Sequence, residues 1–347
     1  MAGGTKGYHQ YRGRGRGSKV LLVVLLLLVL LGAVSFMVLQ KYIVYNDDGS
    51  VKLELPFFQK DSDTPGTIPD DDINIQIDTP DPQPDPEPQP QPPVLQRLTA
   101  YHMPYGCLNS DPAYLLEGES AVVVSLKGAD GALAYASGID LPDGVRSGSA
   151  DTLTHLRAIT ESDCYTIARF SCICDNAYAV ANPAAAVQYS WGGLWLDNYS
   201  RYWLDPTQES TRQYLCAIAK ECAELGFDEL LLDHLRFPIE GDLSQTTVAS
   251  IDRGAAIRTL VEEIREAAGI SMAVSIILPA SIGTDYSFEI SGLPITVLTE
   301  SFDRIYVPAY EDSYYWLTGV LPADFDRQTR LVLTTGYAID GSFVIVN

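Results

Sequence analysis

The chain has 347 residues, of which 46% are apolar and 20% charged, so its composition is globular and excludes a fully disordered protein. Its 45 Asp and Glu residues outnumber 23 Lys and Arg residues, which leaves a formal net charge of -22 at pH 7. Such an acidic chain repels a phosphate backbone, so we expect no nucleic-acid partner.

The basic charge gathers at the N-terminus, where residues 1–19 contain five Lys or Arg side chains and no acidic one. Residues 20–39 follow as an apolar run broken only by Gly32 and Ser35, long enough to cross a hydrocarbon core of about 30 Å as a helix. We therefore predict a basic cytoplasmic tail over 1–19 and a transmembrane helix over 20–40, which makes a single-pass cell-membrane protein with an extracytoplasmic C-terminal domain. The alternative is a cleaved signal peptide, and it exports the same domain.

Residues 41–96 predict an acidic, Pro-rich linker. Between residues 61 and 93 there are ten prolines, nine acidic side chains and no Lys or Arg. Because proline lacks a backbone donor and like charges repel, this segment cannot build a core, and we expect a disordered, extended spacer.

Residues 97–347 have the size and the pattern of an α/β protein of the (β/α)8 TIM-barrel class, which takes about 250 residues. Short apolar runs alternate with helical stretches and predict eight strands, at 98–102, 121–126, 165–173, 230–233, 272–278, 304–307, 331–334 and 342–346. Only about seven residues separate the last two runs, too few for a crossover helix, so we expect the barrel to close irregularly there.

The clearest predicted unit is a helix followed directly by a strand. Asp205 is a candidate N-cap with Pro206 at the first helical position, and Gly226 ends the helix. The strand that follows carries three leucines and ends in Asp233, which a barrel would place at its ligand-binding end. Burying an unpaired carboxylate there costs several kcal/mol, so Asp233 is either functional or held in an ion pair with Arg236 or Arg169.

Alternation along the neighbouring strands predicts the companions of Asp233. It puts Arg169 and Asp175 on one side of the third strand and groups Lys127 with Ser125 on the second. Two cations beside two carboxylates would hold one carboxylate ionised and leave the other to carry a proton, which glycoside hydrolysis requires. The other reading is a polar layer that only stabilises the barrel.

Aromatic residues are dense in two predicted loops, around residues 189–203 and 310–316. Flat rings suit the faces of sugars, and loops at this end of a barrel are where substrate contacts belong. We expect Trp195, Trp203 and Tyr310 to form sugar platforms.

Four stretches resemble a known family: Trp203-Leu204-Asp205-Pro206, residues 224–238 ending in Arg236-Phe237-Pro238, and the segments 122–131 and 167–175, with Tyr310 after the sixth strand. Together they resemble the putative glycoside hydrolase family of bacterial TIM-barrel domains, once classed as a domain of unknown function. The resemblance implies a barrel and suggests action on a cell-surface or environmental polysaccharide.

The chain departs from the family pattern at several positions. Ser125 and Gly128 stand where acidic residues would flank Lys127, and Glu311-Asp312 replace a Pro-Ser-His. Leu235 occupies the place of the chitinase catalytic glutamate, which argues against chitinase-type chemistry.

The sequence therefore predicts a membrane-anchored, extracytoplasmic glycoside hydrolase with Asp233 as a catalytic residue and Asp175 or Glu311 as the second carboxylate. The expected substrate contacts are Lys127, Arg169, Trp195, Trp203, His234, Arg236 and Tyr310. The alternative is a non-catalytic glycan-binding or envelope-scaffold protein with a degenerate hydrolase barrel. We expect no metal and no cofactor, because the four histidines show no metal-ligand spacing. Cys172, Cys174 and Cys222 fall on apolar faces and are expected as buried thiols.

Overall fold

The computed structural model describes residues 43–45, 51–53, 91–104 and 106–346, and the chain divides into two units, residues 1–84 and 85–347. In the first unit the described residues are two antiparallel strands, β1 (Ile43–Tyr45) and β2 (Val51–Leu53). The predicted basic tail, the predicted transmembrane helix and most of the predicted linker lie outside the described residues. No helix in the described part of the chain combines the length and the apolar character needed to cross a bilayer.

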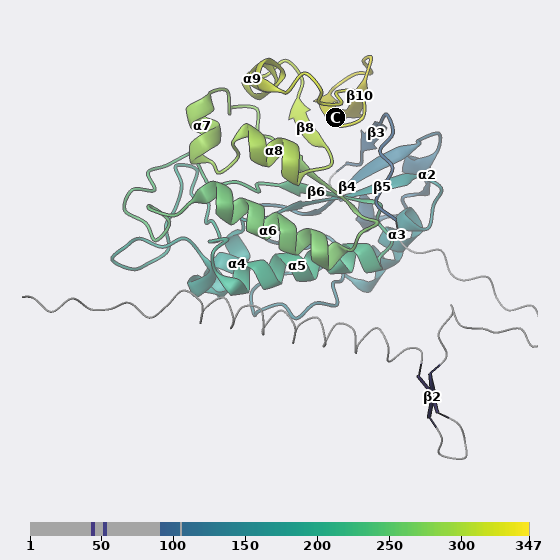
Figure 1. The fold of residues 1–347 in the computed structure, drawn as a ribbon, viewed down its shortest axis with the longest axis horizontal. Helices are drawn as coiled ribbons and strands as arrows, with labels where there is room; N and C mark the ends of the chain where they lie inside the picture. Colours follow the sequence, from purple (N-terminus) through teal and green to yellow (C-terminus); the bar gives the residue numbers. More distant parts are fainter. Residues whose placement is uncertain (1–42, 46–50, 54–90, 105, 347) are drawn as a thin grey trace, which may run out of the picture. The chain divides into compact units, whose positions relative to one another are not determined.

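The second unit is a closed barrel of eight parallel strands, ordered β10-β3-β4-β5-β6-β7-β8-β9 (Figure 1). The strands are β3 (Thr99–His102), β4 (Ala121–Lys127), β5 (Tyr165–Ser171), β6 (Glu229–Asp233), β7 (Ala273–Ile277), β8 (Ile305–Pro308), β9 (Leu331–Thr335) and β10 (Ser342–Ile345). Each lies on one of the eight runs predicted from the sequence, so the predicted TIM barrel is confirmed.

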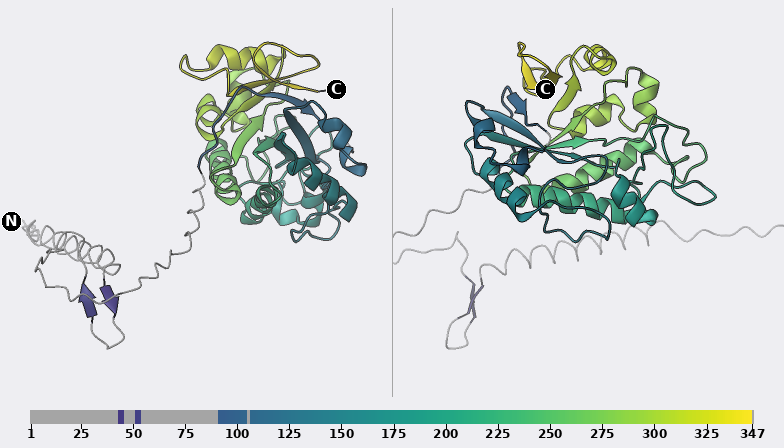
Figure 2. Two further views of the ribbon diagram at one scale, coloured as in Figure 1. Left: turned by 90° about the vertical axis from the view of Figure 1, so that its right-hand side faces the viewer. Right: turned by 180° about the vertical axis from the view of Figure 1, so that it is seen from behind.

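Helices cover the outside of the strands (Figure 2). They are α2 (Ala113–Leu116), α3 (Ala150–Thr160), α4 (Asn176–Ala181), α5 (Glu209–Glu224), α6 (Arg253–Ala268), α7 (Asp285–Ile290), α8 (Ile295–Ser301) and α9 (Asp312–Val320). The two longest, α5 and α6, lie side by side and bury one apolar stripe each, with Leu215 and Ile218 from α5 and Leu260 and Ile264 from α6 fully buried. This burial of a helical stripe against an apolar strand face forms the larger part of the core.

Helix α5 begins later than the sequence predicts. Its N-cap is Gln208 rather than Asp205, and no side chain caps it. Asp205 instead accepts hydrogen bonds from the backbone N–H of Thr207 at 2.9 Å and from the Thr207 hydroxyl at 2.7 Å. The carboxylate therefore closes a turn before the helix, because the same short side chain that caps helices also stabilises Asx turns.

The barrel closes between β9 and β10 without a helix, as predicted. Six residues, 336–341, connect these two parallel strands. The backbone N–H of Phe343 on β10 then donates to the Leu98 carbonyl just before β3, at 2.8 Å. This connection is long enough to run from the end of β9 back to the start of β10 because each of the two strands has only four or five residues.

A buried ionic cluster occupies the amino end of the barrel. Glu229, the first residue of β6, pairs with Arg304 and accepts hydrogen bonds from the hydroxyls of Tyr165 at 2.9 Å and Tyr306 at 2.8 Å. A layer of apolar side chains that includes Leu231 lies in the barrel interior. Since Glu229 has several charged and polar partners inside the protein, we assign it to stability rather than to chemistry.

Candidate functional site

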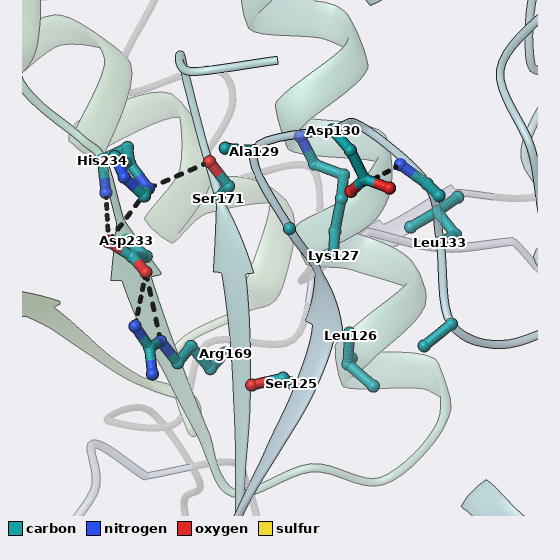
Figure 3. Close-up of a pocket in the computed structure, with 13 residues that line it drawn as sticks. Ser125, Leu126, Lys127, Ala129, Asp130, Leu133, Arg169, Ser171, Asp233 and His234 are labelled. Atoms are coloured by element: carbon teal, nitrogen blue, oxygen red, sulfur yellow. Dashed lines mark hydrogen bonds and ion pairs between the residues drawn. The ribbon is translucent and has the colours of Figure 1, made fainter. Parts of the chain in front are cut away.

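A pocket of about 260 Å³ lies at the carboxyl ends of β4, β5 and β6 (Figure 3). Its polar lining comes from the strand ends and from the loop after β4, and its polar side chains are Ser125, Lys127, Asp130, Arg169, Ser171, Asp233 and His234. The volume is near the lower end for ligand pockets, roughly 300 Å³, and suits a ring-sized group. This is the end of the barrel where TIM-barrel enzymes bind their substrates.

Asp233 ends β6 and faces this pocket together with Arg169 from the neighbouring strand β5. The Nε and Nη2 atoms of Arg169 donate to Oδ2 of Asp233 at 3.2 and 2.7 Å. The side chain of Asp233 is 19% exposed and that of Arg169 is 28% exposed, so the ion pair is open to the pocket. Burial would raise the pKa of Asp233, but the proximity of His234, the charge of Arg169 and the hydrogen bonds from both residues outweigh it and hold the pKa below its ordinary value. Asp233 is therefore a carboxylate at neutral pH, and Arg169 is its partner rather than Arg236.

His234 follows Asp233 in a strained backbone conformation, with φ at 49°. Oδ1 of Asp233 accepts from the His234 backbone N–H at 2.7 Å and lies 3.1 Å from Nδ1 of the ring. Ser171 Oγ lies 3.2 Å from the same Nδ1 and donates its own proton to the Cys174 carbonyl. This arrangement requires a proton on Nδ1. Burial lowers the pKa of His234, so the imidazole is neutral at neutral pH with a lone pair on Nε2.

His102 adds a second imidazole at the mouth. It ends β3, and its Nε2 lies 2.9 Å from Oγ of Ser125 on β4. Burial and the charge of Arg169 lower the pKa of His102 to about 4. The ring is therefore neutral over most of the physiological range and contributes no charge to the pocket.

Lys127 lines the same pocket as Arg169 and Asp233, but Asp175 does not, contrary to the sequence prediction, and the charge of Lys127 is paired with Asp175. A register shift between Ser125 and Lys127 breaks the alternation along β4. Lys127 Nζ lies 2.6 Å from Oδ2 of Asp175, both side chains are fully buried, and the ring of Tyr214 on α5 lies 5.4 Å from Nζ. The pair thus connects the barrel wall to the helix layer.

Asp175, predicted as a second catalytic carboxylate, makes contacts that stabilise the fold. Oδ1 of Asp175 accepts from the backbone N–H of Tyr178 at 2.8 Å and caps α4, while Oδ2 also accepts from the Tyr214 hydroxyl at 3.2 Å. Period-2 counting failed for this residue because the strand ends at Ser171, and residue 175 already belongs to the turn into α4.

Trp195 and Trp203 are buried, so neither offers a face to a sugar, contrary to expectation. Nε1 of Trp195 donates to the Asp242 carbonyl at 3.1 Å. Trp203 donates from Nε1 to Oδ2 of Asp197 at 3.0 Å, and its ring lies 6.0 Å from the ring of His234. Both indoles pack the loops around the pocket.

Arg236 is buried and does not line the pocket. Its Nη2 lies 2.5 Å from Oε1 of Glu240, and its guanidinium stands 5.1 Å from the ring centroid of Trp203. Burial would raise the pKa of Glu240, but the bonds and charge of Arg236 lower it below its ordinary value. Arg236, predicted as a substrate contact, therefore pairs with Glu240 and packs against Trp203 instead.

Tyr310 and Glu311 lie in the exposed turn after β8. Tyr310 has φ at 64° and packs edge-on against Tyr314 at 5.8 Å, and Glu311 precedes α9 without capping it through its side chain. The residues that line the pocket include neither of them. Their roles as sugar platform and second carboxylate stay predictions.

Asp130 is a pocket residue that the sequence analysis missed. It follows β4 in the loop that borders the pocket, and its carboxylate lies 3.5 Å from Arg146 with both side chains open to solvent. The signal for it was present, because the family pattern led us to expect an acidic residue after Lys127, at position 128. The acid stands two positions later, at the far side of a glycine and an alanine.

Among the described residues, no group of three or more His, Cys, Asp or Glu side chains is placed to hold a metal ion. The six cysteines all lie in the described part of the chain and are free thiols. Cys172, Cys174 and Cys222 are fully buried, which confirms the prediction for these three.

Comparison with known families supports the resemblance seen in the sequence. Residues 117–285 match the family described as "putative glycosyl hydrolase domain". The matched segment contains β4, β5 and β6 and therefore every residue of the pocket described above. The resemblance seen in the sequence is confirmed over these residues. No curated protein matches the chain.

Solved structures with a similar course of the chain were also found. A hypothetical protein from Ruminiclostridium thermocellum is 25% identical, with 50% of this chain and 96% of that chain covered and a TM-score of 0.43. The glycoside hydrolase domain of PelA from Pseudomonas aeruginosa is 14% identical, with 70% and 84% covered and a TM-score of 0.41. The α-galactosidase TtGalA from Thermus thermophilus is 14% identical with a TM-score of 0.41, and the match covers 66% of this chain and 46% of that enzyme.

Proposed function

We propose that this protein is a glycoside hydrolase, tethered to the cell membrane through residues 20–40, that acts outside the cytoplasm on a cell-surface or environmental polysaccharide. The observation that carries the proposal is an ionised aspartate, Asp233, facing a pocket at the carboxyl ends of the strands within the segment that matches a glycosyl hydrolase domain. Hydrolysis of a glycosidic bond takes two carboxyl groups, one charged and one protonated.

Asp233 suits the charged role. Arg169 and the N–H groups of His234 keep it ionised, so it acts either as the nucleophile or as the base that activates water. Arg169 lies on Oδ2 and the His234 groups on Oδ1, so the carboxylate is held by both oxygens in one orientation. A fixed carboxylate loses less entropy on reaching the transition state.

Asp130 takes the second role in this proposal. It is the other acidic residue among those that line the pocket, and it sits on a loop rather than on a strand. A proton donor must reach the oxygen of the leaving sugar, which lies toward the open side of the pocket. The loop position is consistent with that task, because loops at this end of the barrel carry most substrate contacts.

The course of the chain also supports a tethered enzyme. Residues 96 and 97 are held at the amino end of the barrel, where Arg304 Nη2 donates to the Gln96 carbonyl at 3.0 Å and Arg97 Nε to the Gly341 carbonyl at 2.9 Å. The chain therefore enters the barrel at the end opposite the pocket. Protease added to intact cells should remove the barrel if it lies outside, and full protection would contradict the proposed location.

A non-catalytic glycan-binding protein is the second candidate. It is favoured by Ser125 and Gly128, which stand where the family pattern has acids, and by the ion pair that engages Asp233. Such a protein would bind polysaccharide in the same pocket and release no reducing ends.

The deciding experiment incubates the purified full-length protein with a panel of polysaccharides and measures new reducing ends. We expect release from at least one member, and a loss of about 100-fold or more in Asp233→Asn with the thermal transition retained. Asp324→Asn, which changes an exposed aspartate between α9 and β9, is the matched control. Glycan binding without reducing ends would support the second candidate, and unchanged turnover in Asp233→Asn would remove this residue from the mechanism.

A further inference from the structure

The segment between α4 and α5 contains an arm made of two short hairpins, residues 187–195 and 196–202. Antiparallel bridges pair Gln188 with Leu194 in the first hairpin and Leu196 with Tyr202 in the second. The loop that follows β6 runs beside the arm, and both extend past α4 at the left of the view in Figure 1. Both segments belong to connections from the carboxyl ends of their strands to the helices that follow, so the arm lies at the same end of the barrel as the pocket that holds Asp233.

The arm is held firmly to its neighbour. Ser190 N–H donates to the Gln245 carbonyl and Thr247 N–H to the Gln188 carbonyl, both at 2.9 Å. Beneath them Trp195 is buried, and Gly241 approaches its ring so closely that a Cβ there would lie 2.7 Å from it. The tip of the arm is therefore ordered before any ligand arrives, which lowers the entropy lost on binding.

Trp191 stands at the tip and is 67% exposed. Its ring stacks on Tyr189, with centroids 4.8 Å apart and planes inclined by 12°. Tyr189 covers one face of the indole, so the exposed surface belongs to the other face. The chain has four tryptophans, and Nε1 of Trp195, Trp203 and Trp316 each donates to a protein acceptor. Nε1 of Trp191 makes no hydrogen bond to the described residues.

We infer that Trp191, backed by Tyr189, is a second glycan-binding subsite, which stacks on one sugar ring of a polysaccharide while another ring occupies the pocket. The inference rests on the proposed function and deepens it, because a pocket of about 260 Å³ accepts a ring-sized group and a longer chain must continue over the rim. The exposed indole face of Trp191 can stack on the C–H groups of a sugar ring, and its N–H, which has no partner among the described residues, can donate to a sugar hydroxyl.

The charges around the arm favour a sugar over a lipid surface. Residues 186–204 and 239–251 carry three acidic side chains, Asp197, Glu240 and Asp242, against one cation, Arg201. Arg201 is itself paired with Asp197 at 2.8 Å. An interfacial membrane anchor of this size depends on Lys and Arg to reach anionic headgroups, and the arm has none to spare.

The test uses full-length protein that carries Asp233→Asn, so that bound glycans stay intact. Isothermal titration with cellohexaose, chitohexaose and maltohexaose should show binding of at least one of the three. Adding Trp191→Ala should weaken that binding about tenfold, and Trp191→Tyr should restore part of it, because a tyrosine still offers an aromatic face. Tyr114→Ala, which removes an equally exposed ring on α2, should leave the affinity unchanged.

Three outcomes overturn the inference. They are no binding of any hexaose, equal affinity of the Trp191→Ala and parent proteins for the glycan, and a Trp191→Ala substitution that abolishes binding to phosphatidylcholine–phosphatidylglycerol vesicles while leaving glycan binding unchanged. Failure of the proposed function is a separate result, because it is measured as the release of reducing ends by the unsubstituted protein. Unchanged thermal transitions in all variants show that the readout reports binding and not unfolding.

Discussion

Arg169 binds one oxygen of the Asp233 carboxylate and leaves the other oxygen to His234. The guanidinium takes Oδ2 with two hydrogen bonds, at 3.2 and 2.7 Å, and leaves Oδ1 to the backbone and ring of His234. The carboxylate is thereby charged, oriented and only 19% exposed. Its reactivity depends on the balance between burial, which favours the neutral acid, and these partners, which favour the anion.

Removing the guanidinium should shift this balance toward the acid. In Arg169→Gln the burial of Asp233 is no longer opposed by the Arg169 charge, so its pKa rises, and the acidic limb of the kcat/KM profile should move up by about one pH unit or more. The profile is measured on the glycan that the panel identifies. Arg258→Gln, which breaks an exposed pair with Glu300, should leave the limb in place. An unmoved limb in Arg169→Gln would contradict the assignment of Asp233 as the charged group.

His102 should make the fold sensitive to acid. The pKa of its imidazole is about 4 in the folded protein and 6.5 as an ordinary value, so between these two pH values the unfolded chain binds a proton that the folded chain does not. The contribution of His102 to stability is therefore constant above about pH 6.5 and falls as the pH drops toward 4, by at most about 3 kcal/mol. Urea unfolding at pH 7 and pH 4.5 measures the difference.

The His102→Gln variant should lose that part of the pH dependence. The control is His155→Gln on α3, where Nδ1 contacts the Leu108 carbonyl at 2.8 Å. If His102→Gln lost as much stability between pH 7 and 4.5 as the unsubstituted protein, the acid sensitivity would have another source.

The Lys127–Asp175 pair should behave as a structural element. Each single variant, Lys127→Met or Asp175→Leu, leaves one charge buried without its partner and should lower the free energy of unfolding by about 3–5 kcal/mol. The double variant removes both charges and should recover most of that loss. Urea unfolding of the three variants checks the cycle. An Asp175→Asn protein that kept its stability and lost turnover would instead return this carboxylate to catalysis.

Gly131 should tolerate no side chain. A Cβ there would lie 2.1 Å from Oδ1 of Asp175, and φ is 87°. Gly118 has a similar φ of 83° with nothing within 4 Å, so Gly118→Ala reports the backbone strain alone, about 1 kcal/mol. Gly131→Ala should cost at least about 2 kcal/mol more, because the loop from β4 must move off the buried ion pair. Equal losses in the two variants, measured by thermal unfolding, would mean that this loop is not packed as described.

The strands could be predicted because their signal is local. Runs such as Leu230-Leu231-Leu232 are apolar on both faces, and only a strand between a barrel interior and a helix layer buries both faces. Asp233 could be predicted for the same reason, because a charged side chain directly after such a run is either functional or held in an ion pair. The structure supplies the partner, Arg169, which was one of two that the sequence left open.

The errors arose where a side chain's direction depends on more than its place in the chain. Lys127 points toward Asp175 because a register shift interrupts β4. Strict alternation along a strand assumes a constant register, so it cannot predict such a shift. Trp195 and Trp203 are buried while Trp191 is exposed, although all three stand within thirteen residues of one loop. An aromatic residue suits a core and a binding surface equally well, so residue type alone does not distinguish them.

By itself the sequence determined the class of fold, the order of its strands and the aspartate at the end of the fourth one, because periodicity and burial are properties of short segments. Only the tertiary structure decided which charges meet, that Asp130 shares the pocket with Asp233 and that Trp191 is the ring left in solvent. These contacts join residues from different strands and loops, and their distances are set by the packing of the whole barrel.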